Sequence, residues 1–174
     1  MAANVPLSVI SSTYNNSYYA TMAIGNNRIF QQPTGGYTGY YWFVVINRKT
    51  LAIEYNQLQT QANVAPNLGN LNTPDHILVV ATLGVGLNNA PQGALYQFLD
   101  ENGGGMELRR IDQIAQQFNC GYLGTFGYCL CCVLGNLNIP GFEVSALGHI
   151  SGPILAIQLL PGSLGYTPIS IPNA

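Results

Sequence analysis

The stretch that decides the fold is TGGYTGYYWFVVINRKT, residues Thr34 to Thr50. A glycine turn leads into the β-branched and aromatic run Tyr40–Ile46, which suits a pleated strand. Because this run is apolar at nearly every position, it predicts a central strand that is covered on both faces. The polar residues Asn47 to Thr50 predict the turn that follows.

Two further apolar runs match the first one. They are Ile77–Thr82 and Tyr128–Leu134, and polar or helical segments separate all three runs. Strands of this length and composition favour the buried centre of a sheet. We therefore expect the three runs to form the core of one sheet.

Weaker patterns predict the remaining strands. Gly25-Asn26-Asn27 favours a tight hairpin, because such turns require positive φ. The expected strands are Val5–Ser12, Tyr18–Ile24, Arg28–Gln32, Leu51–Tyr55, Phe142–Ser145 and Ile154–Leu160.

Three segments have helical patterns. Met106–Phe118 repeats its apolar residues at helical spacing and predicts the clearest helix. Pro91–Asn102 predicts a shorter helix that ends at the glycines Gly103 to Gly105. The polar segment Gln57–Leu71 is expected to form a weak helix followed by a loop.

The charged fraction of this 174-residue chain is unusually low. Charged residues make up 7% of the sequence, against roughly 25% in an average globular protein. The net charge of −2 argues against a nucleic acid or an anionic membrane as a partner. Since 48% of the residues are hydrophobic, disorder is excluded. The composition favours an extracellular module or a subunit of an assembly.

The first residues, MAANVPL, contain no basic residue and no long apolar run. They do not resemble a secretory signal peptide, and no segment has the length of a membrane span. We expect the protein outside the cell or at a particle surface, without membrane insertion. A signal removed earlier, or release by lysis, would account for that location.

The four cysteines are Cys120, Cys129, Cys131 and Cys132. Cys-x-Cys-Cys lacks the two-residue spacer and the second cysteine pair of zinc sites, so we expect no metal. Two arrangements stay open. Cys120 pairs with one of the three strand cysteines, or the strand cysteines are small buried free thiols.

The sequence contains no convincing catalytic set. The two histidines, His76 and His149, lie in predicted turns or loops, and no nucleophile elbow is present. Asp100 and Glu101 are adjacent on a predicted helix, so their carboxylates point apart. We expect no enzyme activity and no cofactor.

Aromatic residues are the better candidates for binding. Tyrosine and tryptophan offer a large apolar face with a polar tip, which suits sugar stacking and protein interfaces. Tyr37 and Tyr40 lie beside glycines, and Asn47 adds an amide. These three residues are the predicted site for weak glycan binding.

The C-terminal segment 161–174 has no charged residue and three prolines. We interpret residues 1–160 as one domain and this segment as an extended, irregular arm. Its apolar side chains Leu164, Tyr166, Ile169 and Ile171 are expected to mediate self-association on an adjacent subunit. An arm that folds back on its own sandwich is the alternative.

The order of these segments resembles the ILEI (interleukin-like EMT inducer) or GG-type lectin domain family. The matching pieces are Gly35-Gly36, Phe43–Thr50, Pro74–Thr82 and the Tyr128 to Gly135 strand, within roughly residues 5 to 147. The resemblance implies an α+β, β-rich fold: one compact β-sandwich with two or three flanking helices. It also implies no catalytic apparatus, and roles in carbohydrate binding or extracellular signalling.

Sugar-binding members of that family carry charged groups in two loops that are uncharged here, Leu83–Gly86 and Leu123–Gly127. We therefore transfer no binding residue from the family. Two functional hypotheses follow. The first is a non-enzymatic extracellular carbohydrate-binding or adhesion module that acts as a multimer. The second is a structural subunit of a filament, virion coat or tail without a sugar ligand.

Overall fold

The computed structural model describes residues 3–12, 18–33, 39–118, 124–148 and 152–171. The predicted ligand residue Tyr37 and the cysteine Cys120 lie outside the described residues, as do Gly35-Gly36 and His149.

The three apolar runs are neighbours in a six-stranded antiparallel sheet, as predicted. β6 (His76–Leu83) pairs with β4 (Tyr40–Asn47) on one side and with β8 (Thr125–Val133) on the other. The sheet is completed by β5 (Ile53–Gln59) beside β4, and by β7 (Val85–Gly86) and β9 (Phe142–Leu147) beside β8.

A second antiparallel sheet has five strands. Their order is β11 (Thr167–Ser170), β10 (Ile154–Leu160), β1 (Val5–Ser12), β2 (Tyr19–Ile24) and β3 (Asn27–Gln31). Ile24 pairs with Asn27, so Gly25 and Asn26 form a two-residue hairpin turn. Gly25 has a φ of 55°, which confirms the predicted need for positive φ at this turn.

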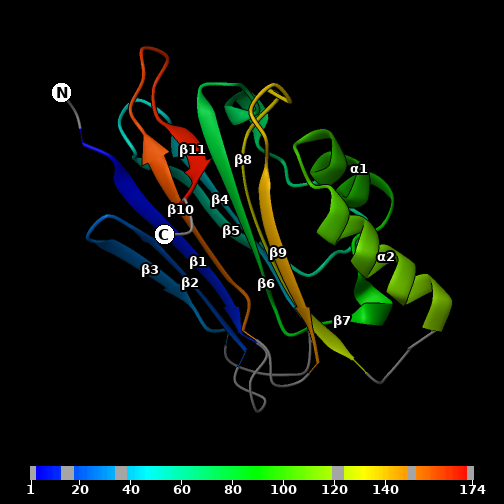
Figure 1. The fold of residues 1–174 in the computed structure, drawn as a ribbon. Helices are drawn as coiled ribbons and strands as arrows, with labels where there is room; N and C mark the ends of the chain where they lie inside the picture. Colours follow the sequence, from blue (N-terminus) through cyan, green and yellow to red (C-terminus); the bar gives the residue numbers. More distant parts are fainter. Residues whose placement is uncertain (1–2, 13–17, 34–38, 119–123, 149–151, 172–174) are drawn as a thin grey trace.

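The two sheets pack face to face, and two helices cover the far side of the larger sheet (Figure 1). Between the sheets lies one apolar core, with Trp42 and Val79 from the six-stranded sheet and Leu7 and Met22 from the five-stranded sheet. A second core fills the space between the six-stranded sheet and the helices α1 (Gly93–Glu101) and α2 (Met106–Phe118). The expected β-rich, sandwich-like architecture with flanking helices is confirmed.

The predicted weak helix after Gln57 is wrong. β5 continues through Gln59 because it pairs along its length with β4, and Trp42 Nε1 donates to Asn56 Oδ1 at 2.7 Å. This pairing overrides a polar sequence that has little strand propensity of its own. The helical element within Gln57–Leu71 is a single 3₁₀ turn, Gly69–Leu71.

The predicted irregular arm is also partly wrong. Thr167–Ser170 forms β11, which pairs with Ile157–Leu160 of the same chain. Tyr166 packs against the core between the sheets. Leu164, at 73% exposure, and Ile171 remain on the surface. Up to Ile171, therefore, the segment after Leu160 belongs to the sandwich.

A buried arginine attaches this segment to the rest of the chain. The Arg48 side chain donates from Nε to Tyr166 O at 2.8 Å, from Nη1 to Pro74 O at 2.7 Å, and from Nη2 to Thr167 Oγ1 at 3.0 Å. Its backbone carbonyl accepts from Tyr166 N at 2.7 Å. Gly165, with a φ of 104°, has no space for a Cβ beside Arg48. Charge-assisted hydrogen bonds of this kind are strong when buried.

We predict that Arg48→Met lowers the free energy of unfolding by about 2–4 kcal/mol, because the part-buried hydrogen bonds to the carbonyls of Pro74 and Tyr166 lose their charged donor. Urea denaturation followed by tryptophan fluorescence measures the change. Lys49→Met is the matched control, since Lys49 is the exposed neighbour and should have little effect. Equal stability of the two variants would contradict this role of Arg48.

Candidate functional site

Two of the three predicted glycan residues lie at opposite ends of one strand. Tyr40 and Asn47 are the first and last residues of β4, about 23 Å apart at ~3.3 Å per residue. Tyr40 is half-buried and packs against the core between the sheets. A single sugar unit therefore cannot contact both residues at once.

Asn47 is engaged in the turn that it closes. Its Oδ1 accepts from Lys49 N at 2.9 Å and Thr50 N at 3.2 Å, and its Nδ2 donates to Glu54 Oε1 at 3.1 Å. Such Asx turns are a local structural use of asparagine.

The same end of the sheet holds a line of hydroxyl, imidazole and carboxylate. His76 Nδ1 lies 3.0 Å from Thr73 Oγ1, and His76 Nε2 lies 2.9 Å from Glu54 Oε2. Thr73 belongs to the same tight turn as His76, whose backbone N–H donates to Thr73 O at 3.1 Å. We assign this line to the stabilisation of the turn before β6.

A second carboxylate, which the sequence analysis did not single out, is fully engaged within the chain. Glu143 Oε1 accepts from Gly105 N and Glu107 N, both at 2.9 Å, and Oε2 accepts from Leu108 N at 3.3 Å and the Tyr128 hydroxyl at 2.9 Å. A carboxylate at a helix N-terminus satisfies free N–H groups and complements the helix dipole. Glu143 therefore anchors the start of α2 to β9.

The three strand cysteines are free and buried. Of the two arrangements left open, the structure has the free thiols. Burial raises the pKa of Cys132 to about 12, and it also raises the pKa of Cys129 and Cys131. Thiols in this state are poor nucleophiles and poor metal ligands at neutral pH.

Neither a metal-binding group nor a membrane helix is found in the part of the chain that the structure describes. No three His, Cys, Asp or Glu side chains there are grouped to hold a metal ion. None of the described helices is long and apolar enough to cross a bilayer.

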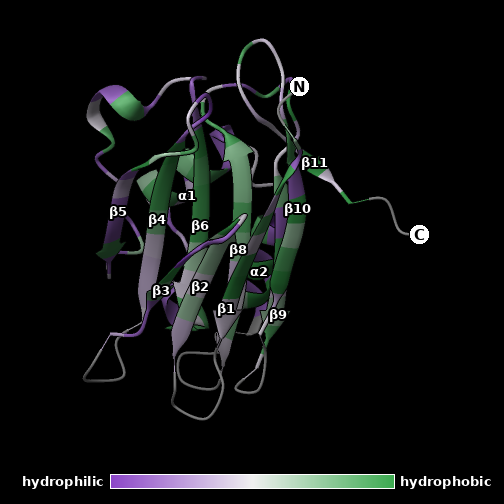
Figure 2. Cartoon of the chain, turned by 90° about the vertical axis from the view of Figure 1, so that its left-hand side faces the viewer, coloured by the Kyte–Doolittle hydropathy of each residue, from purple (hydrophilic) through white to green (hydrophobic). Residues whose placement is uncertain are grey.

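The outward side of the five-stranded sheet, here called the outer face, is a surface whose character the fold alone does not explain. Strand alternation and the pairing registers assign its residues. They are Arg28 and Phe30 of β3; Tyr19, Thr21 and Ala23 of β2; Pro6, Ser8 and Ile10 of β1; Ile154, Ala156, Gln158 and Leu160 of β10; and Thr167 and Ile169 of β11. No described helix or strand covers this face, which is turned toward the viewer in Figure 2.

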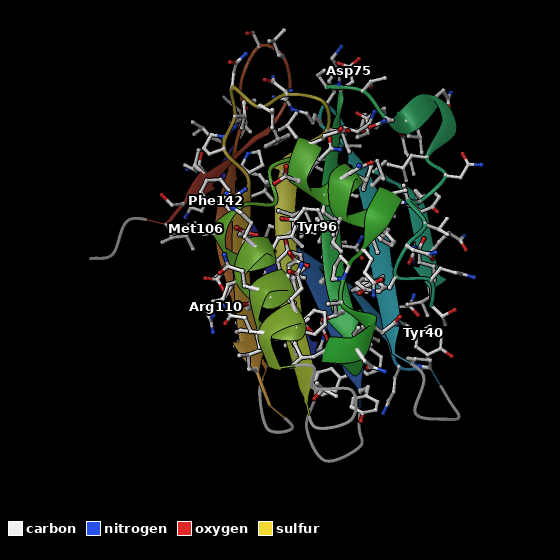
Figure 3. The ribbon with its side chains drawn as sticks, turned by 90° about the vertical axis from the view of Figure 1, so that its right-hand side faces the viewer. Tyr40, Asp75, Tyr96, Met106, Arg110 and Phe142 are labelled. Carbon is white, nitrogen blue, oxygen red and sulfur yellow. The ribbon has the colours of Figure 1, made fainter. Side chains whose placement is uncertain are left out.

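The outer face is apolar where a solvated sheet is normally polar. In an antiparallel sheet with one solvent-exposed face, apolar and polar residues alternate along each strand. Here Ile154 is 59% exposed, Phe30 49% and Leu160 43%, and Arg28 is the single charged member of the face. The opposite side of the molecule, by contrast, presents charged residues of α2 such as Arg110 (Figure 3).

Two details mark the β3 side of the outer face. The rings of Tyr19 and Phe30 lie 5.7 Å apart, tilted by 31°. Thr21, the cross-strand partner of Phe30, has a buried Oγ1 without a hydrogen-bond partner among the described residues. The sequence analysis did not predict this face. The available indication was the strand Ile154–Leu160, in which apolar residues occupy both alternating sets of positions and therefore point to both sides of the sheet.

No family model matches this chain, and no curated protein is significantly similar to it.

We predict that stability falls as pH rises above about 8.5. In that range the unfolded chain releases thiol protons at the ordinary cysteine pKa, whereas the folded chain retains them. Each buried thiol should lower the free energy of unfolding by up to about 1.4 kcal/mol per pH unit. Urea denaturation between pH 8 and 9 measures the slope, below the range in which most tyrosines of the unfolded chain ionise.

Cys132→Ala is the control. Because it removes one buried thiol, the free energy of unfolding should fall less steeply with pH than in the wild type, by the contribution of that thiol. A free energy of unfolding that is constant from pH 8 to 9 would contradict the prediction.

Proposed function

We propose that this chain is a non-catalytic structural subunit that assembles with copies of itself, at a particle surface or outside the cell. The observation that carries the proposal is the apolar outer face with its single charged residue, Arg28. Exposed apolar patches larger than a few hundred Å² usually mark interaction sites. The low fraction of charged residues, from which we expected an extracellular module or a subunit of an assembly, supports this proposal.

The size of the outer face suits a protein partner. Five strands at ~4.8 Å spacing and about six residues in length project an area of ~500 Å². Two such faces together bury ~1,000 Å², which is near the lower limit for specific protein interfaces. A surface of this size with Arg28 as its single charged residue suits a protein partner better than a small molecule.

The strand edges of the same sheet are poorly suited to association. β11 has four residues and includes Pro168, which lacks a backbone donor. β3 has five residues, carries the exposed Arg28 and is followed by Pro33. Short edge strands with proline or charge oppose edge-to-edge pairing. Association is therefore assigned to the face of the sheet.

We predict that the purified protein forms dimers or larger species, and that Ile154→Asp weakens them at least ~tenfold, because a carboxylate would be buried without a partner. Light scattering coupled to size exclusion, over a concentration series, measures the mass. Met106→Asp is the control, since Met106 is 79% exposed on α2, away from the outer face. A wild-type monomer at every concentration would refute the proposed function.

Glycan binding is the second candidate, and the Tyr19–Phe30 ring pair on the outer face favours it. Aromatic rings on a protein surface stack on sugars. This function predicts glycan-array binding that persists in Ile154→Asp and is lost in Phe30→Ala. A blank array with a multimerised sample would reject it.

A further inference from the structure

Two parallel rows of side chains cross the outer face at right angles to the strands. The strand registers place Phe30, Thr21, Ile10 and Ile154 in one row, called the large row. The next row along the strands, called the small row, contains Arg28, Ala23, Ser8 and Ala156. Rows on one face of a sheet are about 7 Å apart, since they differ by two residues. At β1 and β10, the isoleucines of the large row thus lie beside the serine and the alanine of the small row.

We propose that two copies pair face to face about a two-fold axis that runs between these rows and parallel to them. This inference rests on the proposed function and specifies its contact. The rotation sets the large row of each copy over the small row of the other. Ile154 then faces Ala156 of the partner subunit, and Ile10 faces Ser8 of the partner subunit. In a two-fold interface, each such contact occurs twice, once from each subunit.

Size complementarity favours this register. Close-packed interfaces require large side chains to fit beside small ones, as in the interior of a sandwich. If the axis ran instead along the large row, Ile154 would meet Ile154 of the partner subunit, and two large side chains would compete for one space. Pairing Ile154 with Ala156 removes this overpacking.

The position of Arg28 favours the same register. The rotation keeps each strand over its counterpart, so Arg28 lies over the ring of Phe30 of the partner subunit. A guanidinium on an aromatic face makes a favourable cation–π contact. The outer face has no carboxylate to pair with Arg28, and an axis along the small row would place the two arginines opposite each other. A second copy therefore supplies the partner that this charge otherwise lacks.

The decisive experiment mixes two variants, Ile154→Ala and Ala156→Ile, each purified alone. In the proposed register, each homodimer is defective. The Ile154→Ala homodimer has two voids at its interface, and the Ala156→Ile homodimer is overpacked at two positions. The heterodimer has one wild-type contact and one in which isoleucine and alanine have exchanged sides. We expect each homodimer to be roughly tenfold weaker than wild type, with the heterodimer near wild-type affinity.

Native mass spectrometry of differentially tagged variants measures the heterodimer fraction, which should clearly exceed the statistical half. Leu137→Ala and Met106→Ala, exposed residues outside the outer face, are the control pair and should mix statistically. Statistical mixing of the test pair, while both variants still dimerise, would overturn the row pairing and leave the proposed function standing. A monomeric wild type would overturn both.

Arg28→Glu provides a second readout, because a carboxylate is repelled by the negative face of the ring. We expect it to weaken dimerisation at least ~tenfold, with Arg28→Met much closer to wild type. Lys49→Glu, an exposed change of the same sign outside the outer face, is the control. If Arg28→Glu and Lys49→Glu weakened dimerisation equally, the Arg28–Phe30 contact would be refuted, and the change in net charge would account for the loss of affinity.

Discussion

The burial of both faces of β6 is the constraint on which the rest of the structure depends. All eight of its residues are buried, and its backbone pairs with β4 on one side and β8 on the other. One face of the strand packs on the five-stranded sheet and the other on the helices. Since neither face of β6 meets solvent, a covering layer is required on each side of the strand.

Polar groups inside this middle layer are tolerated because they are satisfied. Thr82 Oγ1 accepts from Tyr128 N at 2.9 Å and lies 3.1 Å from Ser11 Oγ, whose hydroxyl also reaches Thr82 O. These bonds join β1, β6 and β8 across the two sheets. Buried polar groups with complete hydrogen bonding help to specify one arrangement of a core.

The two outer surfaces of the molecule differ in character, and that difference directs the functional proposal. The helical side carries ion pairs such as Arg109–Asp100 and Arg110–Glu107. The outer face of the five-stranded sheet carries isoleucine, leucine and phenylalanine with one arginine. A chain with so few charges has concentrated them away from one sheet face, as expected of a surface that is covered in an assembly.

The sequence by itself determined the strands and helices whose patterns are strong: the three apolar runs, the hairpin turn at Gly25 and the helix Met106–Phe118. Their signals are local, because apolar periodicity and positive φ depend on near neighbours in the chain. Only the tertiary structure decided the strand character of Gln57–Gln59, the pairing of β11 with β10 and the separation of Tyr40 from Asn47. The rows on the outer face depend on registers between strands that are distant in sequence, and no local pattern contains that information.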